Sequence, residues 1–69
     1  MSLAEHILNI RERQLGLTQK ELGAALGVGQ VTVSRWERGV VEPRTRHLRK
    51  LAELAEIPLS DFFAEETAA

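Results

Sequence analysis

The chain has 69 residues, no cysteine and a formal net charge of −1. A chain of this length forms one domain with a modest core, and without cysteine neither a disulfide nor Cys-ligated zinc can stabilise it. No apolar stretch approaches the about 20 residues that span a membrane, and no basic and apolar leader opens the sequence, so we expect a cytoplasmic protein with no membrane contact.

The charges are unevenly distributed along the chain. All nine Lys and Arg residues lie between Arg11 and Lys50, where four acids leave a net charge of +5, whereas five acids and no base follow from Leu51 onward. Such a polarity suits a protein that turns one basic face toward phosphates. Charge alone is equally consistent with a helical protein whose mixed charges are solvated.

Helix signals dominate, and no stretch alternates apolar and polar residues as a strand would. Two segments open with a capping box, in which a hydroxyl residue is followed three positions later by glutamate. The first, capped by Ser2, predicts a helix to about Gln14. The second, capped by Thr18, predicts a helix to Leu26. Each is followed by a glycine that ends it, at Gly16 and Gly27.

Three further helical segments follow. One runs from Gln30 to Arg38, with Gly39 as its C-terminal glycine. Pro43 then forbids a continuous helix, and a fourth helix is expected over about residues 45–55. After Pro58 a short fifth helix is expected over about residues 59–64. We therefore predict one all-α domain over residues 1–64, a compact five-helix bundle, followed by an acidic tail over residues 65–69.

The second and third segments form a bihelical motif with a short joint, which forces the two helices to cross steeply. Gly23 supplies the small residue needed where the second helix passes close by, and Gly27 suits a turn with positive φ. The apolar residues of the motif predict a wedge of core, in which Trp36 is buried rather than a stacking platform. These residues are Leu22, Leu26, Val28, Val33 and Trp36.

The outward side of the third segment contains amide, hydroxyl and guanidinium groups and no acid. Such groups match base edges and phosphate oxygens. The residues concerned are Gln30, Val31, Thr32, Ser34, Arg35 and Arg38.

Residues 15–28 and 33–39 closely resemble the helix-turn-helix of the phage Cro and C1 repressor family, and residues 48–63 match its later part. The resemblance covers about residues 5–64. It implies a lambda-repressor-like bundle with the third helix in the major groove, and a bacterial or phage-encoded protein at the nucleoid. By position, the resemblance implies that Gln30, Val31 and Arg35 contact bases. It implies phosphate contacts from Gln19, Thr32, Arg38, Arg44 and Arg46.

Several residues depart from the family pattern. Gly29 and Arg44 stand where capping side chains are common before the third and fourth helices, and a cation is mildly unfavourable at a helix N-terminus. Glu56 stands where glycine often ends the fourth helix. Glu37 is expected to pair with Arg11 or Arg13, with the choice left open because Glu12 falls near the usual arginine position.

We expect a sequence-specific, double-stranded DNA-binding regulator, in particular a repressor that acts as a homodimer on a palindromic operator. The alternative is a protein-interaction module, antitoxin-like, that keeps the fold without specific DNA binding. The absence of acids on the outward side of the third segment favours the first reading. His6 and His47 are isolated, and no nucleophile has a matching base, so we expect no metal, no cofactor and no enzyme activity. One of Phe62 and Phe63 is expected to point outward, where it would serve a dimer.

Overall fold

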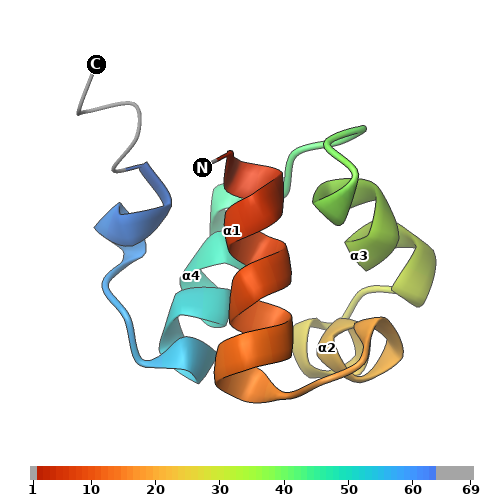
Figure 1. Ribbon diagram of the computed structural model, residues 1–69, viewed down its shortest axis with the longest axis horizontal. Coiled ribbons are helices and arrows are strands. Elements are labelled where there is room, and N and C mark those ends of the chain that lie inside the picture. Colours follow the sequence, from red (N-terminus) through yellow and green to blue (C-terminus); the bar gives the residue numbers. More distant parts are fainter. Residues whose placement is uncertain (1, 64–69) are drawn as a thin grey trace.

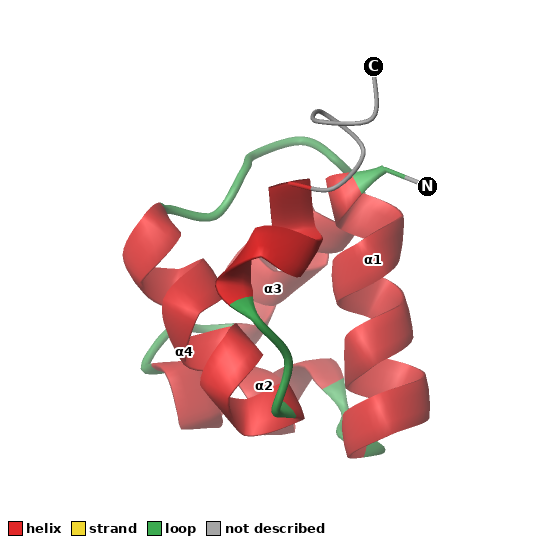
Figure 2. Ribbon diagram, turned by 90° about the vertical axis from the view of Figure 1, so that its left-hand side faces the viewer, coloured by secondary structure: helices red, strands yellow, loops and turns green. Residues whose placement is uncertain are grey.

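The computed structural model describes residues 2–63, and every regular element within that range is helical (Figure 1, Figure 2). The predicted all-α fold is therefore confirmed for these residues, whereas the predicted tail over residues 65–69 lies outside them. In chain order the elements are α1 (Leu3–Asn9), the π-helical segment η1 (Ile10–Leu15), α2 (Gln19–Leu26), α3 (Gln30–Glu37), α4 (Thr45–Ala55) and the 3-10 segment η2 (Leu59–Phe63).

The prediction of five α-helices is not confirmed, because residues 2–63 contain four α-helices and the fifth segment is a 3-10 turn. Pro58 directly precedes η2, and its carbonyl accepts the N–H of Asp61 at 3.0 Å. A segment of five residues has room for little more than one turn, a length at which the tighter 3-10 spacing is common.

The first predicted helix divides into two parts. α1 begins with the expected capping box, in which the Ser2 hydroxyl accepts the Glu5 N–H at 3.1 Å and the Glu5 carboxylate accepts the Ser2 N–H at 3.2 Å. After Asn9 the backbone widens into η1 and ends at Gly16, whose φ is 63°. The N–H groups of Gly16 and Leu17 both bond to the carbonyl of Arg11, so the wide turn closes on this residue.

α2 and α3 form the expected bihelical motif. α2 begins with a complete capping box at Thr18 and ends at Gly27, whose φ is 77°. A Cβ atom on Gly23 would lie 2.7 Å from the carbonyl oxygen of Val28, so a side chain is excluded there. The prediction of a close approach at Gly23 is confirmed, but the neighbouring backbone is that of the turn rather than of the second helix. α3 ends at Glu37, with Arg38 as its C-cap.

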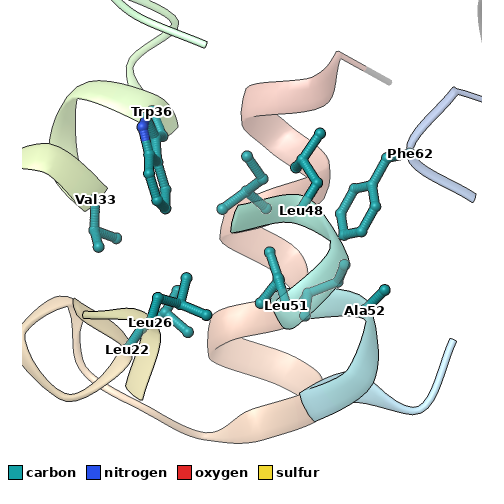
Figure 3. Packing of buried hydrophobic residues seen from close by; sticks show 10 residues of the cluster. Leu22, Leu26, Val33, Trp36, Leu48, Leu51, Ala52 and Phe62 are labelled. Carbon is teal, nitrogen blue, oxygen red and sulfur yellow. The ribbon is translucent and has the colours of Figure 1, made fainter. Parts of the chain in front are cut away.

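The core lies among α1, η1, the two helices of the motif, α4 and η2 (Figure 3). Val33 and Trp36 are buried as predicted, and Val28 is partly buried against the same cluster. Phe62 is buried, and Phe63 is half-buried against the core rather than pointing freely outward. The ten buried apolar side chains are Ile7, Ile10, Leu22, Leu26, Val33, Trp36, Leu48, Leu51, Ala52 and Phe62.

α4 ends at Ala55, although the sequence offers no glycine to end this helix. Its C-cap is Glu56, whose φ of 56° makes it the one non-glycine residue with positive φ in the described range. The N–H of Ile57 bonds to the carbonyl of Ala52 at 3.0 Å, which closes the helix despite the missing glycine. No helix within residues 2–63 is long and apolar enough to cross a membrane.

Candidate nucleic-acid interface

α3 presents two unlike sides. Val33 and Trp36 are buried beneath it, which fixes how the helix is turned on the core. Gln30 and Arg35 are exposed on the outer side, and the side chain of Val31 is 59% exposed between them. The three residues for which base contacts were predicted thus lie on the same helix, and all three are accessible to a ligand.

The cations of α3 have no acidic partner within the described part of the chain. There, Arg11 alone forms ion pairs, with Glu37 and, at 3.9 Å, with Glu12. Arg35 lies in the last turn of α3, and Arg38 at its C-cap is also exposed. Unpaired cations on a side without acids create a positive potential that attracts phosphate.

The start of α3 is open. Its N-cap Gly29 has no side chain, and no acid lies in the first turn. The first N–H groups of a helix have no intrahelical acceptor and carry the positive end of the helix dipole, so this terminus favours an anion. Thr32, for which a phosphate contact was predicted, is half-buried and less available than Gln30.

A buried network joins α3 to the elements before it. The Nε of Arg11 donates to one carboxylate oxygen of Glu37 at 2.6 Å, and an Nη of Arg11 donates to the other at 3.0 Å. This second oxygen also accepts the Nε2 of Gln19 at 3.0 Å. The remaining Nη of Arg11 donates to the carbonyl of Leu17 at 2.9 Å. The network therefore holds the Gln19 amide at the start of α2 beside the end of α3.

The same network shows which arginine pairs with Glu37, a choice that the sequence left open. The partner is Arg11, whose side chain is 10% exposed, whereas Arg13 is exposed to solvent. The bidentate hydrogen bond to Glu37 raises the pKa of Arg11 above its usual value, and burial opposes this effect. Because both charged groups are withdrawn from water, removal of either partner would leave the other charge buried and unpaired, which would destabilise the fold.

α4 starts without a cap. Arg44 occupies the N-cap with no side-chain hydrogen bond to the helix, and the first turn contains no acid. Arg46 is exposed in this turn. The ring of His47 lies 5.3 Å from the ring of Trp36, which ties the start of α4 to α3. The pKa of His47 lies below its usual value because the ring is buried, and because Arg46 and Arg44 are close.

The structure therefore gathers the predicted contact residues around α3 in two different ways. The side chain of Gln19 is held at the C-terminal end of α3 by its hydrogen bond to Glu37. The two residues are 18 positions apart in sequence, so no local pattern predicts this contact. The start of α4 is held beside α3 through His47, to which the sequence analysis assigned no contact. The other histidine, His6, packs against Phe62 with ring centres 5.1 Å apart.

The comparisons with known proteins agree with this geometry. Residues 7–62 match the helix-turn-helix family. The P22 c2 repressor, solved in complex with a synthetic operator, superposes with a TM-score of 0.77 at 29% identity, covering 90% of this chain and 92% of the repressor chain.

Two curated relatives also match. They are uncharacterized HTH-type transcriptional regulators of Sinorhizobium medicae and Rhizobium meliloti, each 26% identical over 58 residues that cover 84% of this chain. The matched region spans 42% of the length of these two relatives. Because the family match takes in nearly all of the described residues and the repressor shares the fold, the chain belongs to the Cro/C1-type helix-turn-helix family of DNA-binding transcriptional regulators.

Proposed function

We propose that this chain is a sequence-specific repressor that binds double-stranded DNA and reads the major groove with α3. The observation that carries the proposal is the outer side of α3, which is exposed, free of acids and lined by an amide, an apolar side chain and unpaired guanidinium groups. A helix fits the major groove, which is about 12 Å wide. The operator complex of the similar P22 c2 repressor supports the same class of partner.

Each predicted base contact follows from the chemistry of its side chain. Gln30, the first residue of α3, offers an amide that can make a bidentate contact with adenine. Arg35 lies about one and a half turns further on and matches the O6 and N7 acceptors of guanine. Val31 offers only apolar contact, which suits the methyl group of thymine.

The phosphate contacts are proposed to flank this helix on both sides. Gln19 keeps one amide hydrogen free after donating the other to Glu37. Arg38 follows α3, and Arg44 and Arg46 stand at the start of α4. Thr32 is the weakest candidate because it is half-buried.

We also propose that the protein acts as a homodimer on a palindromic operator. A single motif reads one half-site, and two half-sites about one helical turn apart need two copies. Val40 and Val41, on the connector after α3, are 62% and 48% exposed and are the proposed contact with the second copy. Sedimentation equilibrium tests this directly, because Val41→Asp should yield a monomer while the wild-type chain dimerises.

We place the DNA-binding unit in residues 1–64 and its action at the bacterial nucleoid, in keeping with the bacterial origin of the relatives. The family and fold are those of DNA-binding regulators, so we assign the chain no catalytic role.

Selection of binders from a random duplex library at two salt concentrations tests the proposed function. A palindromic motif that remains enriched at the higher salt would establish sequence reading by a dimer. Weak binding without a motif, lost as salt rises, would leave only phosphate attraction and would favour the protein-interaction role.

On the selected operator, Arg35→Ala should weaken binding by about 1–3 kcal/mol and relax the preference at one base pair. A uniform loss across all operator sequences would contradict base reading by Arg35.

A further inference from the structure

The outer side of α4 carries a row of cations that the proposed contacts do not include in full. Arg49 and Lys50 follow Arg46 by three and four residues, so all three lie on one side of the helix. All three are exposed, and the core-facing residues Leu48 and Leu51 are buried on the other side. Glu53, four residues after Arg49, ends the row.

This row is unfavourable for the isolated helix. The N-cap Arg44 contributes no side-chain hydrogen bond, the first turn has no acid, and three cations lie in the half of the helix nearest its positive dipole end. Arg46 and Lys50 are like charges four residues apart, which repel. None of these cations forms an ion pair with another described residue.

Several local rules are thus broken together in the first two turns of α4, which marks a functional surface rather than a solvated helix face. The surface is cationic and extends past Arg46 by one turn, about 5.4 Å. An anion with regularly repeated charges, such as the phosphodiester backbone, would remove the repulsion among these side chains. A single small anion would neutralise only part of the row.

We propose that Arg46, Arg49 and Lys50 form a phosphate track, along which α4 contacts the backbone of the same duplex beside the segment read by α3. The new contacts are those of Arg49 and Lys50. The inference rests on the proposed function, which it extends outward from the recognition helix. The start of the track lies near α3, because His47, next to Arg46, packs against Trp36 with ring centres 5.3 Å apart.

The salt dependence of binding to one mixed-sequence duplex of about 24 base pairs tests the track. Each phosphate contact contributes about 0.9 to the slope of log affinity against log salt. The double variant Arg49→Gln/Lys50→Gln should therefore lower the slope by about 1.8 for each protomer on the duplex, which makes the affinity lost between 50 and 200 mM salt about 12-fold smaller per protomer than for the wild-type chain. Sedimentation of the protein with excess duplex should show complexes that contain a single duplex rather than two duplexes bridged by the protein.

The matched control exchanges the two side chains, Arg49→Lys/Lys50→Arg, and keeps both charges in place. It should retain the wild-type slope. Circular dichroism and a thermal scan confirm that the variants are folded, and removing the like charges should leave the midpoint unchanged or raise it.

An unchanged slope in the double variant would overturn the track, as would an equal loss in the charge-keeping control. Loss only of a species that bridges two duplexes would also overturn it, because the contact would then lie on a second duplex. The outcome is independent of sequence reading. A lowered slope in the double variant without any motif from the library would support the track and reject the proposed function. A motif from the library with an unchanged slope in the double variant would support the proposed function and reject the track.

Discussion

The N-termini of α1 and α2 differ from those of α3 and α4 in a consistent way. α1 and α2 each begin with a complete capping box, at Ser2 with Glu5 and at Thr18 with Glu21. α3 and α4 begin at Gly29 and Arg44, with no side-chain cap and no acid in the first turn.

The difference separates two uses of a helix terminus. A capping box satisfies the first N–H groups and places a carboxylate at the positive end of the dipole, so it stabilises the folded chain by itself. A terminus without a cap keeps the same N–H groups and the same dipole available for an external anion. The two capped helices thus belong to the framework, apart from Gln19 at the start of α2, and the two uncapped helices carry most of the surface assigned to DNA.

The largest expected effect comes from the network that joins these two pairs of helices. Glu37→Ala removes the carboxylate that holds Arg11 and Gln19, and leaves the guanidinium of Arg11 buried without its partner. Breaking one side of a buried ion pair costs about 3–5 kcal/mol. Urea denaturation should show a loss of about 3 kcal/mol in the free energy of unfolding.

The matched control replaces the other acid near Arg11. Glu12 lies 3.9 Å from the same guanidinium but its side chain is 58% exposed, so Glu12→Ala should change the free energy of unfolding by less than about 1 kcal/mol. Equal losses in the two variants would show that the Glu37 network does not bind the helix pairs together.

A smaller effect is expected from removing a cap in the framework. Thr18→Ala deletes the hydroxyl that accepts the Glu21 N–H at 3.1 Å. The free energy of unfolding should fall by about 1 kcal/mol. The salt slope of DNA binding should stay at its wild-type value, because no phosphate contact is assigned to this hydroxyl. A lowered slope in Thr18→Ala would show that the cap of α2 takes part in DNA binding and does not only stabilise the framework.

Those features of the fold that depend on residues close in sequence were predictable. The capping boxes at Ser2 and Thr18, the positive φ of Gly27 and the tight position of Gly23 all follow from local steric and hydrogen-bonding rules. Burial of Trp36 follows from its spacing to Val33.

Features decided by tertiary contacts were not predictable in the same way. Nothing local distinguishes the π-helical path of η1 from an α-helix, and nothing local selects Arg11 rather than Arg13 as the partner of Glu37. The bond between Gln19 and Glu37 is likewise invisible in the sequence pattern. For the candidate site, the pattern predicted which side of α3 faces outward, but not that Thr32 and Ser34 are half-buried.

The converse of removing a cap is to add one where the structure has none. Arg44→Ser supplies a hydroxyl at the N-cap of α4 and removes a cation from its positive end. The free energy of unfolding should rise by about 0.5–1 kcal/mol. The salt slope of DNA binding should fall by about 0.9 for each bound protomer, because each loses one phosphate contact.

If uncapped helix termini serve DNA binding, adding a cap should raise the free energy of unfolding and at the same time weaken DNA binding. Gly29→Ser offers a second uncapped site, where the gain in stability should be only a few tenths of a kcal/mol because glycine is already an acceptable N-cap. A loss of stability in Arg44→Ser would show that the arginine supports α4, and the distinction between capped and uncapped helices would then fail.

The smallest expected effect tests the charge around α4 through pH. His47 has a folded-state pKa below the usual 6.5, chiefly because its ring is buried and secondly because Arg46 and Arg44 are near. Its Nδ1 is buried without a hydrogen-bond partner among the described residues. The folded chain therefore binds fewer protons at this site than the unfolded chain does. The stability that depends on neutral His47 is complete above pH 6.5 and declines as the pH falls toward the folded-state pKa.

Urea denaturation at pH 7.5 and 5.5 measures this decline, which should be smaller in His47→Gln than in the wild-type chain. In Arg44→Ser the decline should shrink in part, because one of the two cations that oppose protonation is gone while burial remains. If His47→Gln kept the full decline, the acid sensitivity would arise elsewhere, and the positive potential at the start of α4 would lose its support from this ring.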